Sequence, residues 1–237
     1  MEVPFKNKIG SAGFRAYTQL KGYEFKIAVD KEDVSRANEL RNRIFSDEKY
    51  SDDLANLHEQ QDKFTTIFIC HYKGELVGTI RLVELSKCSA LSLFNVELPD
   101  SICNNNAKEL GGLAVETTHR GVGRIALMGL IDTAYKFSLT NNIHWWLCSS
   151  RGNQYKSFKA INEDCQKLEQ HQPDQLQLET RKIFASWFEK YGGDLVVFVF
   201  DLSGVSYFKN IQTIIKSKFR YGAKTPSRPN TESLDAK

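Results

Sequence analysis

The stretch ELGGLAVETTHRGVGRIA, Glu109 to Ala126, decides how this 237-residue chain is interpreted. Its first half predicts a buried strand, the glycines after Arg120 predict a tight turn, and a long helix should begin near Arg124. At such a junction, backbone N–H groups and the helix dipole favour an anion, and glycine lets a phosphate approach the backbone. The turn lacks the Gly-Lys pair of a P-loop, and Ala126 stands where a dinucleotide-binding loop has its third glycine. The stretch therefore predicts a phosphate-binding turn of another kind.

Composition narrows the class of protein. The 32 basic and 29 acidic residues give a net charge of +3, which is too balanced to imply nucleic-acid binding. The five cysteines are scattered without a CxxC pair, so we expect reduced thiols, no metal and a cytoplasmic protein. We expect neither a signal peptide nor a transmembrane segment, because no apolar run approaches the ~20 residues of a membrane span.

The order of predicted elements indicates the fold class. Strands are expected at 23–29, 65–72, 75–84 (after a tight Lys73-Gly74 turn), 109–115, 143–149 and 194–202. Helices are expected at about 30–46, 124–140, 153–170 and 174–191. Residues 1–20 are expected to be loosely packed, and residues 86–107 should form a long connection. This order predicts an α/β (mixed α+β) protein whose mixed central sheet carries helices on both faces. We expect one domain over residues 1–220, with its core at 23–202 and a disordered polar tail at 221–237.

Three motifs, in this order, resemble the GNAT acyltransferase superfamily and, within it, the acyl-homoserine-lactone synthases and long-chain N-acyl amino acid synthases. The motifs are Arg41-x-Arg43-Ile44-Phe45-x-x-Glu48 with Asp52-Asp53 and His58 after it, Gly78-Thr79-Ile80-Arg81-Leu82, and Glu109-Leu110-Gly111-Gly112-Leu113-Ala114-Val115 followed by Arg120-Gly121-x-Gly123. The resemblance covers about residues 35–150 and implies a GNAT fold. It also implies no tightly bound cofactor, with acyl-CoA or an acyl carrier protein as co-substrate. Two positions depart from the pattern: Gly112 replaces an arginine, and Ile125 stands where the loop usually has glycine or alanine.

The resemblance places the donor along the strand before the glycine turn, in a gap between strands 109–115 and 143–149. The donor-binding residues would be Gly112, Leu113, Ala114, Val115, Arg120, Gly121, Val122, Gly123, Arg124 and Ile125. Glycines inside a strand indicate a bulge or a close backbone approach, and a bulge would direct an N–H at the thioester oxygen. The alternative is that both glycines relieve packing against a helix.

Three residues are predicted to take part in the chemistry. Glu109 is the favoured proton acceptor, directly or through a water; the alternative is an ion pair with Arg81 or Arg43. Arg81 lies in an apolar strand, so it should either bind a substrate carboxylate or order Asp53 or Glu109. Tyr155 could protonate the leaving thiolate, as a tyrosine does in many GNAT enzymes, or could simply pack.

On the acceptor side, the resemblance implies substrate-binding roles for Arg41, Arg43, Phe45, Asp53 and His58, although a lone histidine can also be structural. Residues 209–228 include six basic and no acidic residues. This segment is either a solvated tail or a docking surface for an acidic acyl carrier protein or a membrane surface.

We therefore expect an N-acyltransferase that moves an acyl group, which we expect to be fatty, from a thioester to a small amine such as an amino acid or its derivative, by direct attack. Alternatives are an acetyl-CoA-dependent acetyltransferase and a catalytically weak homologue that binds acyl thioesters.

Overall fold

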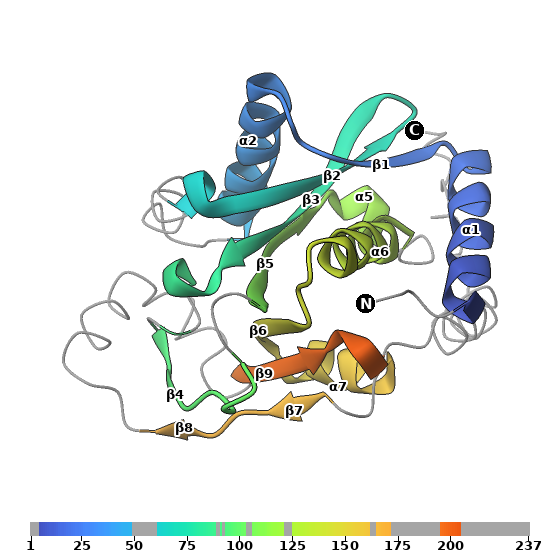
Figure 1. Cartoon of the computed structure of the whole chain (residues 1–237). Coiled ribbons are helices and arrows are strands. Elements are labelled where there is room, and N and C mark those ends of the chain that lie inside the picture. The colour runs from blue at the N-terminus through green and yellow to red at the C-terminus, as the bar shows by residue number, and fades with distance from the viewer. Residues whose placement is uncertain are drawn as a thin grey trace, which may run out of the picture.

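The computed structural model describes residues 5–48, 61–88, 91, 93–102, 106–120, 125–161, 165–171 and 195–204. A seven-stranded sheet has the order β1-β2-β3-β5-β6-β9-β7, and β4 and β8 form a separate pair (Figure 1). The strands are β1 (Tyr23–Ile27), β2 (Thr65–Tyr72), β3 (Glu75–Glu84), β4 (Asn95–Val96), β5 (Ala107–Val115), β6 (Trp145–Arg151), β7 (Gln166–Lys167), β8 (Gln170–His171) and β9 (Leu195–Asp201). The helices are α1 (Phe5–Leu20), α2 (Lys31–Asp47), α5 (Thr117–Arg120), α6 (Ile125–Thr140) and α7 (Gly152–Ile161), with short 3-10 turns η1 (Asp62–Phe64), η2 (Leu85–Lys87) and η4 (Leu202–Gly204).

The predicted mixed sheet is confirmed. Strands β5 and β6 are parallel, and the other strand pairs described are antiparallel. The tight turn between β2 and β3 is also confirmed, because Lys73 and Gly74 both have positive φ, at 51° and 87°. Two consecutive positive φ values match the twist of an antiparallel hairpin, and they favour glycine at the second position.

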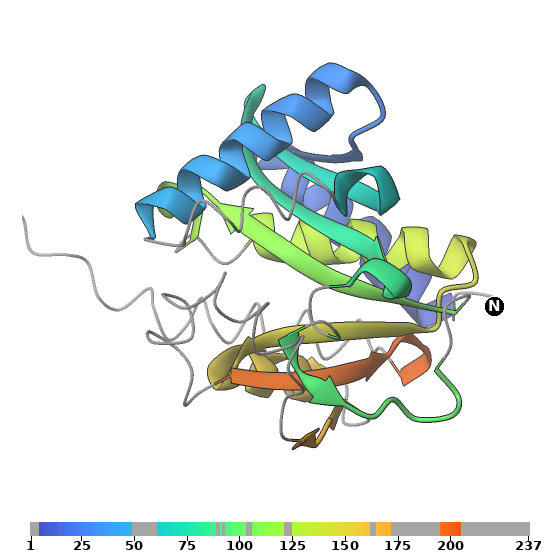
Figure 2. The ribbon, with the colours of Figure 1, turned by 90° about the vertical axis from the view of Figure 1, so that its left-hand side faces the viewer.

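Helices cover both faces of the sheet, as predicted. Helix α2 packs on β3 and β5, whereas α6 packs on β1, β2 and β3 from the other side (Figure 2). The N-terminus of α2 is capped by Asp30, whose carboxylate accepts a 2.7 Å hydrogen bond from the Asp33 amide. Its buried side chains Ala37, Leu40 and Ile44 recur every three or four residues, which gives the helix one apolar face.

Two predictions about secondary structure are wrong. Residues 1–20 were expected to be loosely packed, but Phe5–Leu20 form α1, which lies against β1 and α6. The helix is held there because Thr18 is buried and Tyr17 packs against the main core. The helix expected over 153–170 ends at Ile161, and β7 and β8 follow it.

The segment after α7 is extended because its packing partners are strands. Strand β7 pairs with β9, and the Leu168 amide bonds the Val197 carbonyl at 2.9 Å. Strand β8 pairs with β4, which lies inside the long connection predicted over 86–107. The helix predicted at 174–191 and the tail at 221–237 lie outside the described residues.

Candidate active site

Strands β5 and β6 begin side by side and then separate. They pair at Ala107↔Trp145, Lys108↔Trp146 and Glu109↔Leu147, and their described pairing ends there. Strand β5 continues to Val115 and β6 to Arg151, and the two ribbons diverge (Figures 1 and 2). Past the last pair, the facing edges of the two strands present backbone groups that the other strand does not pair with, and such groups need partners. An extended amide-containing chain could supply them, and the placement of a pantetheine arm in this gap stays a prediction.

The predicted bulge lies at the start of this divergence. Thr79 faces Ala114 and Arg81 faces Gly111, so one residue of β3 is opposite two residues of β5, Gly112 and Leu113. Gly112 has φ +60°, and a Cβ added there would lie 2.7 Å from Nε of Arg81. The bulge is thus confirmed, and the group close to Gly112 is the Arg81 side chain of β3 rather than a helix.

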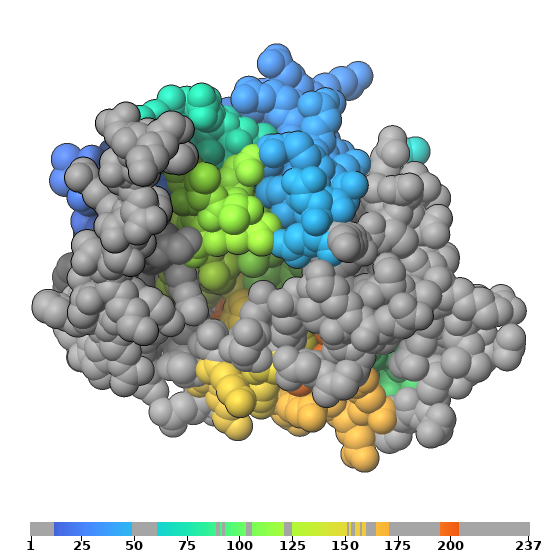
Figure 3. All heavy atoms as spheres, turned by 180° about the vertical axis from the view of Figure 1, so that it is seen from behind, coloured from blue at the N-terminus to red at the C-terminus, as the bar shows by residue number. Residues whose placement is uncertain are grey.

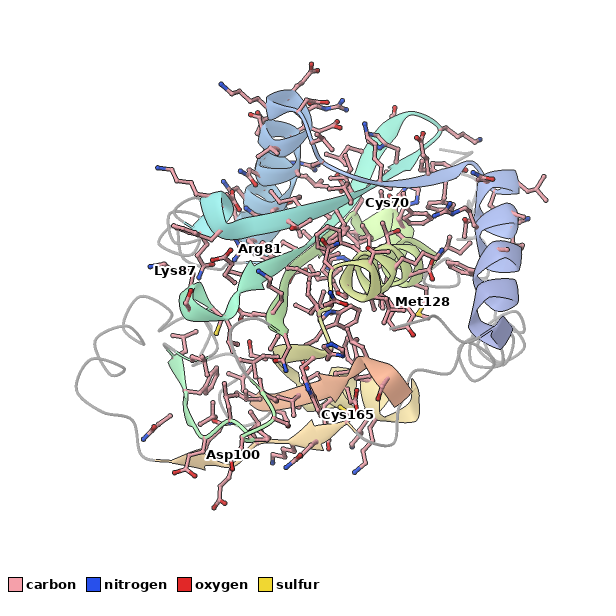
Figure 4. The ribbon with its side chains drawn as sticks, viewed as in Figure 1. Cys70, Arg81, Lys87, Asp100, Met128 and Cys165 are labelled. Atoms are coloured by element: carbon pink, nitrogen blue, oxygen red, sulfur yellow. The ribbon has the colours of Figure 1, made fainter. Side chains whose placement is uncertain are left out.

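Two buried arginines occupy the α2 face of the sheet beside this bulge. Arg81 of β3 (Figure 4) and Arg41 of α2 are each 1% exposed. Both bond Asp62: Nη1 of Arg81 lies 3.3 Å from Oδ1, and Nη2 of Arg41 lies 3.2 Å from Oδ2. Arg81 also donates to the side-chain oxygen of Gln61 at 2.7 Å. Burial, with a smaller effect of the nearby Arg41, lowers the pKa of Arg81 to about 10, although the charges of Glu109 and Asp62 oppose the shift. Arg81 therefore stays charged at neutral pH.

The partners of Arg81 were not all predicted. Asp62 and Gln61 were missed, because they lie in a polar segment that gave no periodic pattern. The available signal was Asp62 itself, an acidic residue shortly before the strand at 65–72. The strand that follows in the chain carries Arg81 among apolar residues, and a buried arginine needs such a partner. Asp53, the other partner considered, lies outside the described residues, as does His58.

Glu109 lies where this charged cluster meets an apolar one. It is 3% exposed, and since Val83 faces Glu109 and Arg81 faces Gly111, Glu109 shares the face of Arg81. Two residues earlier on this face, Ala107 belongs to a second apolar cluster. That cluster consists of Leu85, Cys88, Leu93, Phe94, Ile102, Ala107, Leu147, Leu168, Val197 and Val199, with Phe45 packed against it. Glu109 is thus a buried carboxylate between arginine side chains and an apolar surface, at the last paired position of β5 and β6.

The remaining catalytic candidates are placed by the core. Tyr155 on α7 is half-buried, and its ring packs on Phe198 with centroids 5.2 Å apart, which supports its packing interpretation; its role as an acid stays a prediction. Cys148 is buried in β6, and burial raises the pKa of its thiol well above the ordinary value. A thiol with so high a pKa is a poor nucleophile at neutral pH, in agreement with direct transfer.

The predicted donor residues fall into three groups. Leu113 is half-buried, Ala114 and Val115 are buried, and Ile125 is buried in the first turn of α6, inside the main core. Arg120 uses its side chain within the protein, since Nε donates to the Val115 carbonyl at 2.6 Å and Nη1 bonds Glu48. The other predicted residues, Gly121, Val122, Gly123, Arg124 and the basic segment 209–228, lie outside the described residues.

Arg43 bonds Glu116 rather than Glu109, the partner considered from the sequence. Within the described ranges, no group of three or more His, Cys, Asp or Glu side chains could hold a metal ion. No helix in that part of the chain is long and apolar enough to span a membrane.

Comparison with known proteins extends this picture. The sequence model of the family "N-acyl amino acid synthase FeeM" matches residues 36–171, which is more than half of the chain. The structure of FeeM, an N-acyl amino acid synthase from uncultured soil microbes, has a TM-score of 0.52 at 10% identity, over 76% of this chain and 91% of FeeM. The acyl-homoserine-lactone (AHL) synthase LasI has a TM-score of 0.51 at 15% identity, over 76% of this chain and 90% of LasI. The comparison with curated proteins finds no match.

At such low identity the two structures establish the fold alone, which is the GNAT acyltransferase fold that the motifs predicted. The family match is independent of that likeness and spans most of α2, the buried arginines, the bulge and the diverging strands. Taken with the site geometry, it establishes that this chain belongs to the FeeM family of N-acyl amino acid synthases and is an acyltransferase.

Proposed function

We propose that this enzyme transfers a fatty acyl group from an acyl thioester to the amine of a small acceptor that carries a carboxylate, such as an amino acid. The observation that carries the proposal is the position of Glu109, a buried carboxylate at the point where β5 and β6 diverge. A thioester in the gap would present its carbonyl beside this carboxylate and beside the bulge at Gly112.

The chemistry follows from these groups. Glu109 accepts a proton from the acceptor ammonium, directly or through a water, and the freed amine attacks the thioester carbon. A backbone N–H at the Gly112 bulge stabilises the oxyanion. The C–N bond forms, the C–S bond breaks, and the thiolate leaves with a proton, for which Tyr155 is the candidate donor. No covalent enzyme intermediate is required.

Arg41 supports an acceptor that carries a carboxylate. Its Nε and Nη1 groups are buried, and neither finds a hydrogen-bond partner in the described part of the chain. Buried donors of a charged group are costly when unpaired, and a carboxylate is the usual partner of a guanidinium. Phe45, which packs on the apolar cluster one helical turn along α2, would contact the apolar part of the substrates. Asp53 and His58 remain proposed contacts.

The second apolar cluster favours a fatty chain over an acetyl group, because it meets Glu109 on the same face of β5. Acyl carrier protein is the donor we favour over acyl-CoA. Ile125 packs in the core where a small residue would approach the diphosphate of coenzyme A, and the segment 209–228 is basic. The four described cysteines are free, as expected for a cytoplasmic protein.

A matrix of donors and acceptors read by mass spectrometry tests this proposal. Acetyl, decanoyl and palmitoyl groups should be offered on coenzyme A and on an acyl carrier protein, each with the twenty amino acids. We expect N-acyl amino acids from long-chain donors. Activity with acetyl-CoA alone would show that the fatty-acyl proposal is wrong.

The role of Glu109 has its own test. Glu109→Gln should lower turnover at saturating substrates by roughly 10²–10⁴-fold while the protein stays folded, because that is the usual effect of losing an acid–base group. Glu75→Gln, at the exposed start of β3, is the matched control and should leave turnover unchanged. Near-normal turnover of Glu109→Gln would mean that another group takes the proton.

A further inference from the structure

The turn that follows β5 is tied to other elements through its side chains. We call residues 116–120, which include α5, the donor turn. Glu116 forms an ion pair with Arg43, and Arg120 forms one with Glu48. Between them, the His119 Nδ1 and the Tyr23 hydroxyl of β1 share a hydrogen bond of 2.9 Å. Three of the five residues of this turn are therefore attached to β1 or to the C-terminal part of α2.

The two ion pairs have opposite polarity. Helix α2 supplies a cation at Arg43 and its C-cap residue Glu48 supplies an anion, whereas the donor turn supplies an anion at Glu116 and a cation at Arg120. Sliding the turn along α2 would bring like charges together, so the pairs fix one register between the two segments. Figure 3 shows the same relation in space, with the end of α2 (light blue) directly against the end of β5 and the donor turn (light green).

The donor turn and α2 are each also attached to a region that is predicted to bind a substrate. Arg120 holds the end of β5 through the Val115 carbonyl, so the donor turn moves with the strand that carries the bulge. Arg41 is two residues before Arg43 on α2 and bonds Asp62, which also bonds Arg81. A displacement of the donor turn should therefore also displace α2, the helix that supplies Arg41 on the acceptor side.

We propose that Glu48, Arg120, Arg43 and Glu116 are positioning residues that couple donor binding to the order of the C-terminal turn of α2. This inference rests on the proposed function, because it takes the region around the donor turn as the thioester site. Since Nε and Nη1 of Arg120 are bonded within the protein, the donor orders the turn without taking Arg120 from Glu48. Ordering one end of a linked pair of segments orders the other, and this is positive coupling.

Hydrogen exchange measures the coupling without knowledge of the acceptor. The reporter is the peptide spanning residues 43–48, whose last amide bonds the Ile44 carbonyl at 3.1 Å. Its exchange should be followed with and without dodecanoyl-CoA, and with and without a dodecanoyl acyl carrier protein. In the native protein the bound donor should slow exchange about two- to fivefold, the range expected if exposed ion pairs transmit the effect.

Four variants, one of them a double substitution, separate positioning from general stability. Glu48→Gln should abolish the donor-induced protection and weaken donor binding about two- to fivefold, with little change in melting temperature because both pairs are partly exposed. Asp132→Asn, which breaks the Lys136–Asp132 pair on α6, is the matched control and should keep the protection. Arg43→Glu should lose protection, and adding Glu116→Arg should restore it by reversing the polarity of the pair.

The outcomes are distinct. Donor binding without a change in the 43–48 peptide would overturn the coupling and leave the proposed function intact. Faster exchange on binding would also overturn it, since that result means that the donor phosphate displaces Glu48 from Arg120. Failure of both thioester donors to bind at all would overturn the proposed function together with this inference.

Discussion

Replacing Gly112 with alanine should destabilise the protein far more than the same change at Gly111, its neighbour in β5. Gly112 has φ +60°, and an added Cβ would lie 2.7, 3.0 and 3.1 Å from Nε, Cδ and Cγ of Arg81. Arg81 cannot simply move aside, because its guanidinium bonds Asp62 and Gln61. The left-handed backbone costs an alanine about 1–2 kcal/mol, and losing one buried hydrogen bond of a charged group costs about 1.5–3 kcal/mol. We expect a total loss of about 2.5–5 kcal/mol in the free energy of unfolding.

Gly111→Ala is the matched control. Gly111 has no positive φ, and an added Cβ would meet only the Glu109 side chain, at 3.8 Å or more. Its effect should stay within about 1 kcal/mol, because removing a glycine also restricts the unfolded chain. Urea unfolding followed by fluorescence of the buried Trp146, with equal m-values for the variants, gives both free energies. A difference of less than about 1 kcal/mol between the two variants would refute this account of the bulge.

Two further predictions concern stability. Gly129 of α6 lies against Phe25 of β1, where an added Cβ would fall 2.0 Å from the ring; Gly129→Ala should therefore destabilise the native protein. In a Phe25→Ala background the same change should stabilise by about 1 kcal/mol, the helix preference of alanine, and an unchanged sign in thermal melts would contradict the packing argument. Burial and then Lys26 lower the pKa of His71, so the unfolded chain binds the proton more readily. The free energy of unfolding should therefore fall as the pH drops below about 6.5, the ordinary histidine value, and the fall should shrink in His71→Gln; an identical pH profile in denaturant titrations would remove His71 as the cause.

Local signals explain which elements could be predicted. The β2–β3 hairpin followed from Lys73-Gly74, because two positive φ values in a two-residue turn leave few alternatives. The helix expected from about residue 30 begins close to that point, where the Asp30 carboxylate accepts a hydrogen bond from an amide of the first turn of α2. The bulge followed from two glycines in an apolar strand. In each case, the residues that decide the structure lie within a few positions of one another.

Elements whose stability depends on distant partners were not predictable in this way. Strand β7 has only two residues and exists because β9 pairs with it, so the local sequence was taken for helix. Helix α1 was missed because it packs against β1 and α6. Helix α6 lies more than 100 residues further along the chain, so the sequence around α1 does not reveal this contact.

The sequence by itself determined the fold class, the order of the central elements along the chain and the placement of Glu109, Gly112 and the arginines on particular elements. Turns, helix caps and hydrophobic periodicity depend on residues that are close together in the sequence, so they can be recognised without the structure. Only the tertiary structure decided which charges meet: Asp62 with both buried arginines, Arg43 with Glu116, and Arg120 with Glu48. These pairs join residues 19 to 73 positions apart, and the physical reason is that charge pairing depends on the final distance and burial of two groups, which no local pattern encodes.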